Sequence, residues 1–250
     1  MKKRIIKIIL LIVLLLILFF PIPLGTYDDG GTRTYMALTY KIVKWNRLRG
    51  TSHIAPGAEE DRYSTTSVFW FPDNFKSYEE LWKLEREKNR IEVPEDFTIS
   101  FTWGTFGVST YDSDTGKLIK KTKYTENTEG HTLADYTTEY HLSDTEKEDL
   151  FRLITDMDFG SYPDEYNPYE GKYSSPSVTI IIRVKYKGFD KTISCVDIVE
   201  PLGLWFIEYF SPDQLPEKAK KFLRLYNVLY DILVNSEEWK ALPEFEIRFR

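Results

Sequence analysis

The stretch Val178-Thr-Ile-Ile-Ile-Arg-Val-Lys-Tyr186 decides how this chain folds. Its even-numbered residues are all apolar, and its odd-numbered residues are Thr, Ile, Arg and Lys. Such alternation indicates a β-strand that buries one face. Lys187-Gly188 then predicts a tight turn into a second strand at residues 191–196. Two strands joined in this way are antiparallel.

Similar patterns surround this hairpin. Residues 97–103 alternate like a half-buried strand, and residues 112–116 read Asp-Ser-Asp-Thr-Gly, a hairpin turn. Ser143 and Glu146 form a capping box before a helix with the apolar face Leu150, Phe151, Ile154 and Met157. A last helix starts at Pro216. We therefore predict an α+β fold of ββαββα type for residues 96–250, with helices packed on one face of an antiparallel sheet.

The preceding residues, 26–95, are less regular. Residues 34–45 read as one strand with Met36, Leu38, Tyr40 and Ile42 on one face. Residues 51–66 are polar and predict a loop, and residues 68–71 a short strand. Ser77 and Glu80 form a second capping box, which predicts a helix over residues 78–88. This part either packs with residues 96–250 as one unit or forms a part of its own.

The N-terminus predicts export. Lys2, Lys3, Arg4 and Lys7 precede an unbroken apolar run over residues 8–20, followed by two prolines. Because no pair of small residues offers a cleavage site, we expect residues 5–24 to form a retained transmembrane helix, a signal-anchor within residues 1–25. The chain would then be a single-pass membrane protein with its N-terminus in the cytoplasm and its C-terminal domain outside. The alternative is a protein secreted after signal cleavage.

Composition narrows the functional classes. The chain has a formal net charge of −6, and its basic N-terminus makes the remainder more acidic still. This charge argues against a nucleic-acid partner and against binding of that remainder to anionic lipid. A single cysteine, Cys195, excludes an internal disulfide, and its strand-like surroundings favour a buried, inert thiol.

Motifs for chemistry are sparse. His53, His131 and His141 show no metal-ligand spacing, so we expect no metal and no cofactor. Asp158-Phe-Gly160 reads as a helix end with the glycine at the cap. Residues 156–165 hold four carboxylates, those of Asp156, Asp158, Asp164 and Glu165. A pair of carboxylates at a fixed separation can hydrolyse glycosides, although a solvated acidic loop is the simpler interpretation.

The loop that follows is rich in tyrosine. Exposed tyrosines make protein and sugar contacts, whereas buried ones pack in a core, and both interpretations stay open here. The candidate partner-binding residues are Tyr162, Tyr166, Tyr169 and Tyr173.

Three segments resemble a family of uncharacterised exported or membrane-anchored proteins of Gram-positive anaerobes. They are residues 21–46, which begin Pro-Ile-Pro-Leu-Gly-Thr-Tyr, residues 161–168, Ser-Tyr-Pro-Asp-Glu-Tyr-Asn-Pro, and residues 238–244, Glu-Trp-Lys-Ala-Leu-Pro-Glu. The resemblance implies export and a cell-envelope location. It implies no activity.

The function expected from these observations is a membrane-tethered, non-enzymatic module that binds an envelope protein or glycan outside the membrane. Such a module should expose an aromatic patch. The alternative is an enzyme, a cell-wall-polymer hydrolase that uses the carboxylates between Asp156 and Glu165. A third hypothesis, an enzyme inhibitor, rests on fold analogy alone.

Overall fold

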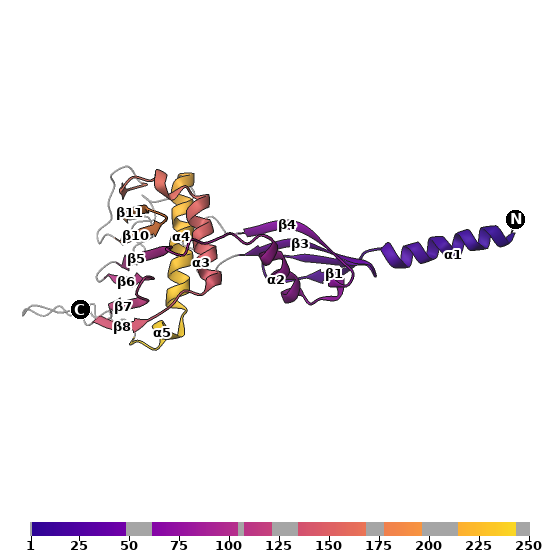
Figure 1. Cartoon of the computed structure of the whole chain (residues 1–250), viewed down its shortest axis with the longest axis horizontal. Coiled ribbons are helices and arrows are strands. Elements are labelled where there is room, and N and C mark those ends of the chain that lie inside the picture. The colour runs from indigo at the N-terminus through magenta and orange to yellow at the C-terminus, as the bar shows by residue number, and fades with distance from the viewer. Residues whose placement is uncertain are drawn as a thin grey trace, which may run out of the picture. The chain divides into compact units, whose positions relative to one another are not determined.

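A computed structural model describes residues 2–48, 62–104, 108–121, 135–168, 178–196 and 215–243 of the chain. These residues form two compact units, both drawn in Figure 1. Unit 1 holds the described residues up to 90, and unit 2 holds those from 91 onward. The boundary lies close to the one expected between residues 95 and 96.

Unit 1 is a four-stranded antiparallel sheet with helices, and its strand order is β1-β2-β3-β4. The helix α2 begins with the predicted capping box, in which Glu80 accepts a hydrogen bond of 2.7 Å from the Ser77 backbone N–H. The elements of unit 1 are α1 (Lys2–Phe19), β1 (Ile22–Thr26), β2 (Arg33–Met36), β3 (Tyr40–Leu48), β4 (Arg62–Trp70), the single 3-10 turn η1 (Asp73–Phe75) and α2 (Tyr78–Lys88).

Residues 34–45 do not form the single strand predicted from their alternation. The Ala37 N–H donates to the Tyr40 carbonyl at 2.8 Å, and this turn separates β2 from β3. The turn contains none of the Gly, Pro, Asn or Asp residues that mark turns in a sequence. Instead, the Asn74 side chain donates to the carbonyls of Ala37 and Leu38, at 3.3 and 2.9 Å. A residue distant in the sequence therefore stabilises the turn.

The predicted loop over residues 51–66 also needs correction. Residues 62–66 belong to β4, which pairs with β3 from Leu48↔Arg62 to Tyr40↔Trp70. The stretch Ser64-Thr-Thr-Ser67 is polar, which suggested a loop, but β-branched threonine suits a strand whose outer face is exposed.

The prediction of a transmembrane helix over residues 5–24 is wrong. Helix α1 ends at Phe19, and Ile22–Thr26 leaves the apolar run to pair with β2 as β1. The charge-free part of the helix, residues 8–19, is only about 18 Å long at 1.5 Å per residue, and a membrane span needs about 20 residues. Among the described residues, none of the helices combines the length and apolar character that crossing a membrane requires. The prediction of a signal-anchor is therefore wrong as well, whereas the location of the chain stays a prediction.

Unit 2 is a mixed sheet with strand order β8-β7-β6-β5-β10-β11-β9, so the overall fold is α+β. Four strands precede its first long helix, where the ββαββα prediction had two. The elements are β5 (Thr98–Gly104), β6 (Ser109–Asp112), β7 (Lys117–Lys121), β8 (Asp135–Glu139), α3 (Asp144–Asp156), η2 (Phe159–Ser161), β9 (Glu165–Tyr166), β10 (Thr179–Tyr186), β11 (Phe189–Val196), α4 (Glu217–Val234) and α5 (Glu237–Lys240).

The decisive hairpin forms as predicted. Strands β10 and β11 pair in register from Thr179↔Val196 to Tyr186↔Phe189, and both turn residues, Lys187 and Gly188, have positive φ. All pairs in the sheet are antiparallel except β9 with β11, which are parallel. Strand β9 lies in the segment 161–168 that was expected to be a loop, and its two residues are too few to give a sequence signal.

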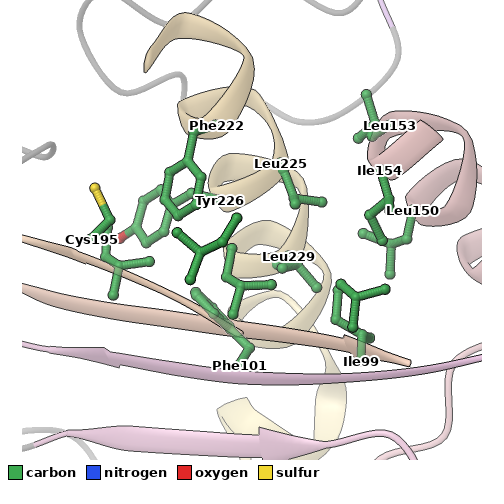
Figure 2. Close-up of a cluster of buried hydrophobic side chains, with 14 of the residues drawn as sticks. Ile99, Phe101, Leu150, Leu153, Ile154, Cys195, Phe222, Leu225, Tyr226 and Leu229 are labelled. Atoms are coloured by element: carbon green, nitrogen blue, oxygen red, sulfur yellow. The ribbon is translucent and has the colours of Figure 1, made fainter. Parts of the chain in front are cut away.

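The core of unit 2 lies between α3, α4 and one face of this sheet (Figure 2). Phe101 on β5 and Phe222 on α4 are fully buried, and Leu150 and Ile154 point toward the same strands from α3. The Cys195 thiol is also completely buried in this core, as the inert-thiol interpretation expected.

Helix α3 ends differently from the prediction. Gly160 was expected to cap it, but Asp158 takes the left-handed conformation, with φ 53° and ψ 60°. This conformation is strained for any L-residue with a Cβ, whereas glycine adopts it without steric cost. Aspartate tolerates it better than most residues.

Replacing Asp158 by glycine is therefore expected to stabilise the chain by about 0.5–1 kcal/mol, because the strained Cβ is removed. Urea unfolding followed by circular dichroism measures the change. Asp158→Ala serves as the control, since it removes the carboxylate but retains the Cβ. A gain in both variants would assign the effect to the charge and contradict the backbone explanation.

Candidate functional site

The tyrosines predicted to contact a partner do not gather on a surface of the described structure. Tyr162 is only 2% exposed, and its hydroxyl donates to the Lys218 carbonyl at 2.7 Å. Tyr166 is half-buried, with its ring centroid 5.3 Å from that of Tyr162 and 6.0 Å from that of Phe222. Burial raises the pKa of both hydroxyls, that of Tyr166 to about 12. These two tyrosines therefore pack in the core. Tyr169 and Tyr173 lie outside the described residues.

The carboxylates of the hydrolase alternative are all exposed, and they are those of Asp156, Asp158, Asp164 and Glu165. Asp164 forms an ion pair with Lys191 at the surface. Glycoside hydrolysis requires two carboxyl groups that face each other, one of them in surroundings that keep it protonated. Four solvated carboxylates give that mechanism no support.

The one histidine that the structure describes gives no metal centre either. His53 and His131 lie outside the described residues, and the ring of the exposed His141 lies against Gly116 in the β6–β7 turn. Within the described ranges, no group of three or more His, Cys, Asp or Glu side chains is placed to hold a metal ion.

A candidate site appears instead on unit 1, on the side of its sheet opposite α2. The α2 side is closed: Val43 and Trp45 of β3 are buried against Leu81 of α2. A cation–π contact also joins the sheet to α2 on this side, because the Arg47 guanidinium lies 4.8 Å from the centre of the Trp82 ring. The remaining strand positions point away from the helix.

Two rows of side chains cross that opposite side, and we call them the open face. The first row is apolar and joins Tyr35, Ile42 and Val68, which are direct neighbours on β2, β3 and β4. The second row is polar and cationic and joins Arg33, Lys44 and Thr66 in the same way. The side-chain period of two in each strand therefore assembles the open face.

The open face is exposed and carries positive charge. Val68 is 47% exposed, and all three residues of the second row are exposed. Lys44 places its ammonium 5.4 Å from the centre of the Tyr35 ring, so the two rows are in contact. The described positions on this side of β2, β3 and β4 include no Asp or Glu, although the chain has a net charge of −6.

The sequence could not reveal the open face. Its rows depend on the register between three strands, and the alternation of residues 34–45 predicts one strand where the structure has two. The alternation in 62–70, with Thr66, Val68 and Trp70 on one side, was the available signal.

Compared with protein-family models and with curated protein sequences, the chain gives no match. The resemblance to exported proteins of Gram-positive anaerobes therefore stays a prediction.

Proposed function

We propose that the chain is a non-enzymatic binding module that holds a protein partner with an acidic surface on the open face of unit 1. The observation that carries this proposal is the apolar row of Tyr35, Ile42 and Val68 lying directly beside the cationic row of Arg33 and Lys44. Contiguous apolar surface with a charged rim is typical of protein interaction sites.

The composition of the apolar row favours a protein over a glycan. Two of its three residues, Ile42 and Val68, are aliphatic and β-branched, which suits burial against other apolar side chains. A sugar ring stacks best on a flat, accessible aromatic ring. Tyr35 is half-buried and already has the Lys44 ammonium near its ring, so it offers little of that surface.

Charge complementarity then specifies the partner. Arg33 and Lys44 are exposed, and the described positions on their side of β2, β3 and β4 carry no carboxylate, so the open face attracts acidic side chains and repels basic ones. The acidic remainder of the chain repels the same partner, which would direct it to this face. A non-enzymatic role is supported by the exposure of the four carboxylates that the hydrolase alternative requires.

The partner can be identified by photo-crosslinking in cells that express the full chain. A photoreactive phenylalanine at position 68 is expected to capture one protein, and the same group at position 83, on the exposed side of α2, is not. Capture of an acidic polysaccharide at position 68 would show that the partner is a glycan and not a protein. Equal capture at both positions would overturn the site.

Charge reversal then tests the site with the purified partner. Arg33→Glu together with Lys44→Glu is expected to weaken binding about tenfold or more, because the cationic row would repel an acidic surface. The matched control is Lys83→Glu with Lys88→Glu, which makes the same charge change on α2. Calorimetry at low salt measures both, and an equal loss in the control would show that only net charge matters.

A further inference from the structure

A second exposed surface lies at one end of the unit 1 sheet, around the β2–β3 turn. Four large apolar residues there are mostly in solvent: Leu38 is 50% exposed, Trp70 60%, Phe71 69% and Phe75 54%. We call these four residues the apolar tip. Monomeric proteins rarely expose several large apolar side chains together unless they bind something.

The apolar tip is a built structure held by hydrogen bonds. The Phe71 N–H donates to the Thr39 carbonyl at 2.9 Å, which ties the end of β4 to the turn. Asn74, which is fully buried, donates to the Leu38 carbonyl at 2.9 Å. The rings of Phe71 and Phe75 meet edge to face, with centroids 6.2 Å apart. Their exposure is therefore a fixed property of the turn.

Helix α1 ends at this same turn. The Thr39 N–H and hydroxyl both donate to the Leu18 carbonyl, at 3.3 and 2.8 Å. The Tyr40 hydroxyl donates to the Phe19 carbonyl at 3.0 Å. Carbonyls at a helix end have no partner within the helix, and here the turn that carries Leu38 supplies them. The apolar tip is thus continuous with the end of α1.

The exposure of α1 indicates what covers this surface. Every residue from 8 to 17 is an aliphatic side chain between 46% and 62% exposed, so the helix is apolar on all sides. A protein partner buries one stripe of a helix and would leave the other apolar sides of α1 in water, whereas lipid can contact more than one side of a helix that does not cross the bilayer. Arg4 and Lys7 near its start are exposed and carry the charge that anionic lipid headgroups attract.

We propose that the apolar tip is a lipid-contact site, which sits in the interface of a membrane beside α1. Aromatic rings are favoured at this depth, and the tip supplies three of them. The acidic residue of η1, Asp73, is paired with Lys76 at 2.7 Å, which reduces the charge that would oppose lipid contact. Contact of this kind needs no helix that crosses the bilayer. The proposal does not rest on the partner proposed for the open face.

Quenching by brominated lipid tests the proposal directly. The full chain is diluted from detergent into vesicles of phosphatidylcholine and phosphatidylglycerol, with or without bromine on the acyl chains near the headgroup. Tryptophan emission is expected to fall in the brominated vesicles, and Trp70→Phe should remove most of that loss. Trp239→Phe, which replaces a tryptophan of unit 2, should leave the loss unchanged.

Flotation of the same vesicles measures the contribution of the tip to binding. Phe71→Ser with Phe75→Ser is expected to lower the lipid-bound fraction about tenfold, and Tyr136→Ser, an exposed aromatic of unit 2, should have no effect. If the wild-type chain does not float, lipid contact is wrong for both α1 and the tip. If it floats but Trp70 is not quenched and the phenylalanine variant binds equally, α1 binds alone and the tip proposal is overturned.

Discussion

Replacing Phe222 by alanine is expected to destabilise unit 2 by about 3–5 kcal/mol. The Phe222 side chain is fully buried on α4, and its ring centroid lies 6.0 Å from those of both Tyr162 and Tyr166. Truncation to alanine leaves a cavity that these rings cannot fill, because Tyr162 is fixed by its hydrogen bond to Lys218. Urea unfolding gives the loss, and hydrogen exchange over 217–234 assigns it to α4.

The result also decides between the two interpretations of the tyrosine loop. A loss of this size is expected if Tyr162 and Tyr166 are core residues that pack on α4. A cost below about 1 kcal/mol, similar to that of an exposed substitution, would mean that the loop packs only loosely on α4 and would return these tyrosines to the candidates for partner contact. Tyr136→Ala is the matched control, because it removes an aromatic ring that is 37% exposed on β8.

The core of unit 2 could be predicted because its sheet buries a single face. In Phe97–Trp103 and Val178–Val184 each buried residue is followed by one that is not, so burial can be read directly from the order of residues. Both capping boxes were equally readable. Ser77 with Glu80 and Ser143 with Glu146 act within one turn of a helix, and no distant residue is involved.

The turns of unit 1 could not be predicted for the opposite reason. The turn at Ala37–Thr39 depends on Asn74 and on the end of α1, both far away in the sequence. The early end of α1 has a similar origin. Ile22 is as apolar as the helix before it, but pairing with Met36 of β2 places it in a strand. The residues next to Ile22 in the sequence do not indicate that pairing.

The sequence left the role of Tyr162 and Tyr166 open because exposure is a tertiary property. Tyr162 lies in a segment rich in proline and tyrosine, which is compatible with a surface loop. Its burial follows from packing against Phe222, which arrives on a helix much later in the chain. The open face shows the converse. The sequence predicts a short strand at residues 68–71 but not which of its sides is buried, and the position of α2 on the other side of the sheet leaves Val68 exposed.

A buried carboxylate connects the stability of unit 1 to the open face. Glu85 of α2 is only 4% exposed, and it accepts hydrogen bonds from the Tyr63 hydroxyl at 2.5 Å, the Ser67 hydroxyl at 2.7 Å and the Asn89 amide at 3.1 Å. Ser67 in turn accepts from the indole N–H of Trp45 at 3.1 Å. Buried polar groups are stable only when such networks are complete.

Replacing Glu85 by alanine is therefore expected to destabilise unit 1 by about 2–4 kcal/mol, because several buried donors lose their acceptor together. Glu85→Gln should cost less, since one oxygen remains to accept. Glu87→Ala, an exposed position on the same helix, should be close to neutral. Urea unfolding ranks the three variants, and a Glu85→Ala loss no larger than that of Glu87→Ala would refute the network.

The same variant is expected to weaken partner binding without touching a residue of the open face. Tyr63 and Ser67 lie on β4, and the alternating positions of that strand carry Thr66 and Val68 to the other side. Once the carboxylate no longer holds β4 from the α2 side, faster hydrogen exchange over 62–70 should accompany the loss of affinity. Binding that survives while β4 exchanges faster would show that the partner itself orders the open face.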